Sequence, residues 1–163
     1  MFKNKIFFLF FFLTTYTVFS QNIIGRDTIH NQKEVIQLDW IPTYDEALER
    51  SKIEKKPVLI YFTGSDWCGP CILLDKELFH TEKFKELSDE ALLLLEVDSP
   101  RNQTLLSQDK ISENLYLKNK YKVRSFPTLV FVNHKGKKIA EKKGYIMTEY
   151  YYPFIVSVIN NFK

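Results

Sequence analysis

The stretch Trp67-Cys68-Gly69-Pro70-Cys71 contains both cysteines of this 163-residue chain. It follows a strand-like apolar run, residues 57–62, and stands where a helical pattern begins. Because three residues make nearly one helical turn, the two sulfurs are expected on the same side, where they can form a disulfide. A cysteine at the N-terminus of a helix meets unpaired N–H groups and the positive end of the helix dipole, which favour its thiolate.

This arrangement predicts thiol chemistry at the two cysteines. A thiolate is the form of cysteine that attacks disulfides, so we expect Cys68 to be the nucleophile and Cys71 the resolving cysteine. Gly69 and Pro70 form the loop between the sulfurs. Pro70 falls within the first helical turn, where its missing N–H costs little and its ring stiffens the loop.

Other uses of a cysteine pair fit the sequence less well. As a structural staple, so short a loop gains about 2 kcal/mol, against about 5 kcal/mol for a long one. A zinc site needs four ligands, but there is no second cysteine pair, and His30, His80 and His134 are scattered and expected to be solvated. Haem attachment needs a histidine directly after Cys71, where the chain has Ile72. We therefore expect neither a metal nor another cofactor.

The N-terminal residues have the layout of a secretory signal peptide. Two lysines precede an apolar run, residues 6–13, and a more polar stretch ends at Ser20, the expected cleavage point. A membrane anchor is the alternative, but the apolar segment is shorter than the about 20 residues that a spanning helix needs. We therefore expect residues 1–20 to be removed and the protein to be exported, periplasmic or extracytoplasmic, where disulfides are made and exchanged.

The mature chain is nearly neutral. Removing Lys3 and Lys5 with the signal peptide leaves 21 of the 23 basic residues against 20 acidic ones, a net charge of +1. Such a balance argues against nucleic acid as a partner. We expect a loose lead-in over residues 21–37 and one domain over residues 38–163, which is long enough for a packed core and is expected to be monomeric.

The hydrophobic pattern predicts a mixed α/β sandwich. Thr43 with Glu46 is a capping box for the first helix, residues 99–111 are expected to be a loop, and Asp75 is expected to face water. A parallel half of the sheet precedes an antiparallel hairpin, whose turn is at residues 133–136. The strands are expected at residues 35–40, 57–62, 91–97, 128–132 and 137–142, and the helices at 43–55, 68–78, from 81, at 112–122 and from 151.

Together these features resemble the thioredoxin superfamily over residues 38–162. Its active-site motif is matched by residues 67–71, and the segment leading to its cis-proline by Tyr121-x-Val123-Arg124-x-Phe126-Pro127-Thr128. The sequence of residues 62–68 resembles the corresponding sequence of exported bacterial thioredoxin-like proteins more than that of cytosolic thioredoxin. The resemblance implies a thioredoxin fold, a central mixed sheet flanked by helices. An N-terminal strand–helix unit would precede this core, and residues 99–120 would be an inserted segment before the cis-proline.

The resemblance also implies roles for further residues. The peptide bond before Pro127 would be cis and would pack beside the sulfurs, so that Phe126 exposes main-chain groups to a bound substrate. Trp67 would belong to the substrate-facing rim and, with Gly69 and Pro70, would support the active site.

One departure from the family concerns proton transfer. Thioredoxins usually carry a buried aspartate on the strand before the active site, but the corresponding positions here are Tyr61 and Phe62. Glu96, at the end of the neighbouring strand, could substitute. A solvated carboxylate is the simpler expectation for Glu96.

The function that the resemblance implies is thiol–disulfide exchange in the cell envelope, most simply the reduction of protein disulfides by Cys68 and Cys71. Its partners would be disulfide-containing proteins and a membrane-embedded electron donor. Two alternatives stay open. One is a disulfide oxidase or isomerase of the same fold, and the other is a non-catalytic binding module, which the missing buried acid motivates.

Overall fold

The computed structural model describes residues 36–162 of the chain, so the expected signal peptide, residues 1–20, and most of the lead-in lie outside the described part. The sheet has four strands in the order β2-β1-β3-β4. β1 pairs in parallel with β2 and antiparallel with β3, which pairs antiparallel with β4. The mixed sheet predicted from the sequence is confirmed; its strands are β1 (Val58–Thr63), β2 (Leu93–Asp98), β3 (Thr128–Val132) and β4 (Lys138–Lys143).

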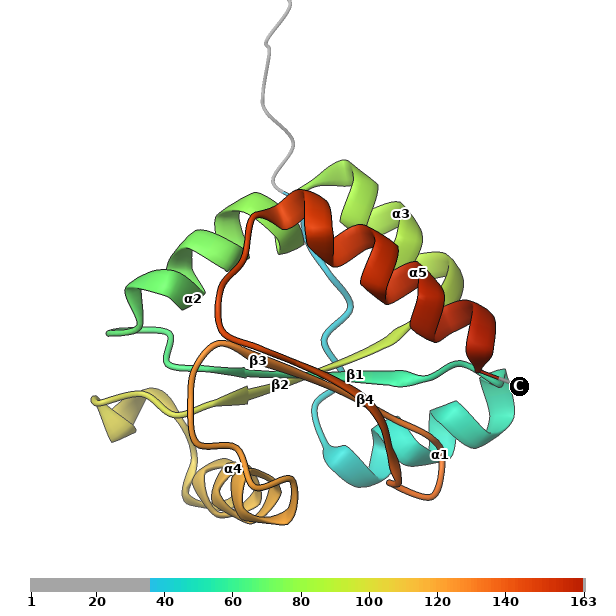
Figure 1. The fold of residues 1–163 in the computed structure, drawn as a ribbon. Coiled ribbons are helices and arrows are strands. Elements are labelled where there is room, and N and C mark those ends of the chain that lie inside the picture. The colour runs from blue at the N-terminus through green and yellow to red at the C-terminus, as the bar shows by residue number, and fades with distance from the viewer. Residues whose placement is uncertain (1–35, 163) are drawn as a thin grey trace, which may run out of the picture. The chain divides into compact units, whose positions relative to one another are not determined.

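Helices cover both faces of this sheet (Figure 1). One face carries α1 (Tyr44–Glu54) and α4 (Gln108–Lys120). The other carries α2 (Gly69–Leu74), α3 (Glu82–Ala91) and α5 (Tyr151–Asn161). α2 continues directly into a π-helical turn, η1 (Asp75–Phe79), and two 3-10 turns are η2 (Gln103–Leu105) and η3 (Thr148–Tyr150). Among these helices, none is long and apolar enough to cross a membrane.

The central strand β1 contributes to two hydrophobic cores. All six of its residues are buried, as the continuous apolar run predicts for a strand covered on both faces. Val58, Ile60 and Phe62 belong to the core beneath α1 and α4. Leu59 and Tyr61 belong to the core beneath α2, α3 and α5, which also contains both cysteines. The disulfide is therefore built into the second core.

Local capping signals set several helix boundaries as predicted. The hydroxyl of Thr43 accepts a hydrogen bond from the N–H of Glu46 at 3.3 Å, and the hydroxyl of Thr81 accepts one from the N–H of Phe84 at the same distance. A side-chain oxygen that satisfies a free N–H in the first turn stabilises the start of a helix. The last helix begins at Tyr151, also as predicted.

Other boundaries differ from the prediction. The strand expected at residues 35–40 is reduced to a single parallel bridge from Trp40 to Leu94, since Pro42 has no N–H to continue pairing and α1 begins two residues later. The helix expected from residue 112 begins at Gln108, because the hydroxyl of Ser107 accepts a hydrogen bond from Lys110 and caps it. The expected loop at 99–111 is correspondingly shorter, and β2 begins only at Leu93 because α3 extends through residue 91.

Candidate active site around the Cys68–Cys71 disulfide

β1 leads directly to the cysteine pair. The chain turns after the strand, and the N–H of Cys68 donates a hydrogen bond to the carbonyl of Gly64 at 2.8 Å. α2 begins at the next residue, which makes Cys68 its N-cap and places Pro70 in the first turn. Cys68 and Cys71 form a disulfide whose Cα atoms are 5.2 Å apart. The predicted placement of both sulfurs on one side of a helix start is confirmed.

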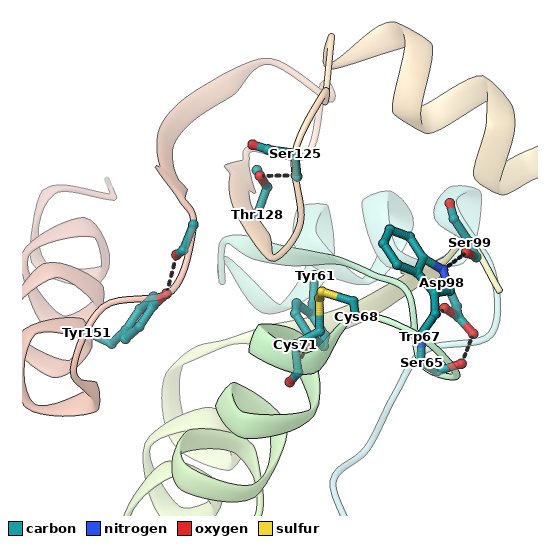
Figure 2. The surroundings of a disulfide bond; sticks show 11 residues. Tyr61, Ser65, Trp67, Cys68, Cys71, Asp98, Ser99, Ser125, Thr128 and Tyr151 are labelled. Carbon is teal, nitrogen blue, oxygen red and sulfur yellow. Dashed lines mark hydrogen bonds between the residues drawn. A yellow bond between two sulfur atoms is a disulfide. The ribbon is translucent and has the colours of Figure 1, made fainter. Parts of the chain in front are cut away.

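Both cysteines are largely covered in this disulfide form. Cys68 is 4% exposed and Cys71 is 1% exposed. The hydroxyl of Tyr61 donates a hydrogen bond to the carbonyl of Cys71 at 3.2 Å and thereby ties α2 to the central strand; Figure 2 shows Tyr61 next to the sulfur pair. In the reduced form the first N–H groups of α2 would face the sulfur of Cys68, and this favours its thiolate.

Trp67 lies on the surface beside Cys68. Its side chain is 38% exposed, and its indole N–H donates a hydrogen bond to the carbonyl of Ser99 at 2.9 Å (Figure 2). The ring meets Phe126 edge to face with 5.8 Å between ring centroids, and the guanidinium of Arg101 lies 5.3 Å from the Trp67 ring centroid. Trp67 therefore has a rim position and is not a core residue.

The Trp67 ring also packs directly against Gly64. A Cβ atom at Gly64 would lie 2.5 Å from ring atoms of Trp67, so the ring would have to move. We expect Gly64→Ala to shift the tryptophan emission maximum when Trp40 is replaced by Phe, so that Trp67 is the remaining tryptophan. Gly69→Ala is the matched control, because a Cβ there meets nothing within 4 Å. An emission spectrum equally unaffected by both substitutions would contradict this packing.

Two aspartates anchor the active-site loop to the segment after β2. Asp98 accepts hydrogen bonds from the N–H of Ser65 at 2.8 Å and from its hydroxyl at 2.5 Å. Asp66 accepts hydrogen bonds from the N–H groups of Asn102 and Arg101, each at 2.9 Å, and these bonds hold the pKa of Asp66 below its ordinary value. No local pattern in the sequence predicts this anchoring, since it links residues more than 30 positions apart.

The loop before β3 approaches the same site. The Phe126–Pro127 peptide bond is cis, as the resemblance implied. The hydroxyl of Thr128 donates a hydrogen bond to the carbonyl of Ser125 at 2.8 Å and closes this turn (Figure 2). Phe126 is partly buried and packs against the core that contains the cysteines. The structure thus brings together the sequence-predicted residues Trp67, Cys68, Cys71 and Phe126.

β1 has no acidic residue, and two carboxylates from other elements, Glu96 of β2 and Asp75 of η1, are candidates to replace the missing aspartate. Of the two positions expected for the missing acid, Tyr61 belongs to the core that contains the cysteines and Phe62 to the other core. Glu96 is the partner of Tyr61 on the neighbouring strand β2. Burial raises the pKa of Glu96 to about 7, with a further contribution from the negative charges of Asp98 and Asp75. The expectation that Glu96 is a solvated carboxylate was wrong. Asp75, expected to face water, is only partly exposed, and burial raises its pKa as well.

Glu96 should make the protein less stable as the pH rises. Its pKa is about 7 in the folded protein, whereas an unfolded chain has a glutamate pKa of about 4.3, so the folded state binds the proton more tightly. The free energy of unfolding therefore decreases as the pH rises from about 4 to 7. We expect wild type to lose on the order of 2 kcal/mol between pH 5 and pH 8 in urea unfolding, and Glu96→Gln to lose clearly less.

The control for this measurement is Glu90→Gln, on the exposed side of α3. It is expected to keep the wild-type dependence on pH. If Glu96→Gln shows the same slope as wild type, the assignment of this titration to Glu96 is wrong.

Possible metal ligands do not gather elsewhere in residues 36–162, which contain no group of three or more histidine, cysteine, aspartate or glutamate side chains placed to hold an ion. His80 and His134 are exposed, as predicted. His30 lies outside the described residues.

Known proteins share this fold and parts of this sequence. The family model of the thioredoxin-like domain matches residues 44–158. The disulfide bond reductase DsbH of Chlamydia pneumoniae is 40% identical over 103 residues, which are 63% of this chain and 61% of that protein. The thioredoxin-related protein DsbJ of the same organism is 31% identical over 100 residues, 61% of this chain and 28% of DsbJ.

A solved structure of a DsbH oxidoreductase superposes with a TM-score of 0.69 at 34% identity, covering 78% of this chain and 88% of the DsbH chain. This chain spans less than two thirds of the length of the DsbH and DsbJ sequences from Chlamydia pneumoniae. The family model, by contrast, covers well over half of this chain and includes the cysteine pair and the cis-proline. The chain therefore belongs to the family of thioredoxin-like domains.

Proposed function

We propose that this protein is a thiol–disulfide oxidoreductase that reduces disulfides of other proteins through Cys68 and Cys71. The observation that carries the proposal is the cysteine pair at the start of α2, next to an exposed tryptophan and the Phe126–Pro127 loop. The similarity to DsbH, which is named as a disulfide bond reductase, supports the reducing direction.

The proposed reaction starts from the dithiol form of the protein. The thiolate of Cys68 attacks one sulfur of the substrate disulfide; a bond between Cys68 and that sulfur forms, the substrate disulfide breaks, and the departing thiolate takes up a proton. Cys71 then loses its proton and attacks Cys68. The Cys68–Cys71 bond forms, the mixed disulfide breaks, and the second substrate thiolate is protonated. Two electrons and two protons have passed to the substrate.

The surroundings of the two sulfurs suit this division of roles. Cys68 stands at the end of the helix where N–H groups stabilise a thiolate, beside the exposed rim. Cys71 lies within α2 and is almost completely buried, so external disulfides cannot reach it easily. Glu96 is the register partner of Tyr61, which belongs to the core that contains the cysteines. A carboxylate with a pKa of about 7 is well matched to accept the proton of Cys71 near neutral pH.

Insulin reduction tests the proposed activity. With dithiothreitol as the electron source, the wild-type protein is expected to speed the precipitation of insulin B chains well above the uncatalysed rate. Cys68→Ser is expected to return the rate to background, because the attacking sulfur is missing. Wild-type turnover no faster than that of Cys68→Ser would refute the proposal. Such a result would favour the alternative of a non-catalytic binding module. A pKa of the Cys68 thiol near that of a free cysteine would support this alternative.

The reduction potential separates a reductase from an oxidase or isomerase of the same fold. It is measured by equilibrating the Cys68–Cys71 pair with mixtures of reduced and oxidised glutathione. We expect a value in the reducing range of thioredoxin, about −270 mV. A value near about −120 mV, as for a strong disulfide donor, would reverse the assigned direction.

Export and resupply of electrons belong to the same proposal. The pattern of residues 1–20 supports a cleaved signal peptide, with residues 38–163 acting as a monomeric domain in the cell envelope. A reductase outside the cytosol needs electrons from elsewhere, so we propose a membrane-embedded donor that reduces the Cys68–Cys71 disulfide. N-terminal sequencing of the secreted protein tests the cleavage: a mature chain that begins near Gln21 is expected, and an intact residue 1 would contradict it.

A further inference from the structure

A groove lies beside the disulfide site and is built largely by the segment that follows β2. Its volume is about 440 Å³. Trp67 and Phe126 line it on the side of the cysteines. The inserted segment lines it with apolar side chains from Leu106, Ile111 and Leu115. Leu115 is 53% exposed, so the groove presents large apolar side chains to solvent.

Hydrogen bonds hold the walls of this groove in place. The indole of Trp67 is bonded to the carbonyl of Ser99, the first residue after β2; Figure 2 shows this bond next to Asp98. Asn114, on α4, is 3% exposed, and its Nδ2 donates a hydrogen bond to the carbonyl of Asp98 at 2.8 Å. The active-site loop, the end of β2 and α4 are therefore linked. A groove formed in advance lowers the ordering cost of binding.

We propose that this groove receives a large apolar side chain next to the reactive cysteine of a polypeptide substrate, and that its rim favours an acidic residue beside that side chain. The proposal rests on the proposed function, since the substrate is held while its disulfide is exchanged. Continuity with the site supports it: Trp67 directly precedes Cys68, and Phe126 directly precedes Pro127. A chain whose cysteine meets Cys68 passes over these two rings, which are in edge-to-face contact, and can place a neighbouring side chain in the groove that both rings line.

The charge of the rim selects the acidic partner. Arg101 and Lys118 line the groove. The carboxylate of Asp98, which lies there too, is already occupied by two hydrogen bonds from Ser65. Opposite charges at the rim of a binding site speed association and favour the matching partner.

Two synthetic peptides test the inference, each joined through its cysteine to glutathione by a mixed disulfide. One has the sequence Asp-Leu-Cys-Leu-Asp and the other Ser-Ser-Cys-Ser-Ser. We expect the pre-reduced wild-type protein to reduce the first at least about tenfold faster than the second, as for an apolar group gained in a pocket. Leu115→Ser is expected to bring this ratio below about three. Lys118→Glu is expected to lower it at low salt and to have less effect at high salt.

Matched controls separate the groove from general surface effects. Ile53→Ser and Lys52→Glu change exposed residues of α1 in the same way and are expected to keep the wild-type ratio. A wild-type ratio near one, an unchanged ratio in Leu115→Ser, or an equal loss in Ile53→Ser would each overturn the inference. Insulin reduction by wild type reports the proposed function alone. Its failure would overturn that function, whereas activity on insulin without discrimination between the peptides would overturn only the groove.

Discussion

Replacing Cys71 with serine is expected to trap substrate proteins on Cys68 as long-lived mixed disulfides. The first exchange step needs only Cys68, whereas release needs the thiol of Cys71, which is held within the same helical turn. An intramolecular thiol acts at an effective concentration far above that of external thiols. Its loss should therefore lengthen the life of the mixed disulfide by at least about a hundredfold. Non-reducing gels should show adducts that dithiothreitol dissolves, and mass spectrometry of the adducts would identify the substrates.

Cys68→Ser is the matched control for this trap. The remaining Cys71 is 1% exposed in the disulfide form, so it is expected to capture almost nothing. The adducts of Cys71→Ser should also disappear when both cysteines are replaced. If Cys68→Ser captures as much protein as Cys71→Ser does, the roles of nucleophile and resolving cysteine are assigned to the wrong residues.

Phe79→Ala is expected to lower the free energy of unfolding by about 3–5 kcal/mol. Phe79 ends η1 and is completely buried. Its ring centroid lies 4.6 Å from that of Tyr61, 4.9 Å from that of Phe84 and 5.6 Å from that of Trp40. Truncation removes apolar burial and leaves a cavity between α3 and the sheet, and such a cavity collapses only in part. Urea unfolding of oxidised wild type and variant measures the difference.

Tyr150→Ala is the control for this loss. It removes an aromatic side chain that is 55% exposed in η3, and is expected to change stability by no more than about 0.5 kcal/mol. A loss below about 1 kcal/mol in Phe79→Ala would mean that the aromatic cluster can repack around the missing ring. It would contradict the close packing of Phe79 against Tyr61, Phe84 and Trp40 from which the large loss is expected.

The sequence alone was enough for those features that depend on near neighbours. The helix starts at Thr43 and Thr81 follow from a side-chain oxygen and an N–H three residues apart. β1 was predictable because a strand buried on both faces is continuously apolar. The disulfide was predictable because Cys68 and Cys71 are the only two cysteines and stand less than one helical turn apart. In each case the residues that form the sequence pattern are the same few residues whose local structure it predicts.

Tertiary structure decided the features that depend on distant parts of the chain. The strand expected at residues 35–40 reduces to the Trp40 bridge, because pairing at the edge of β2 ends where Pro42 and α1 begin. Glu96 has a raised pKa because packed segments exclude water from a carboxylate that looks like an ordinary strand-end residue in the sequence. The anchoring of Asp66 and the groove beside Trp67 arise where the segment after β2 meets the active-site loop. Desolvation and long-range hydrogen bonds are properties of the folded chain, and no local pattern encodes them.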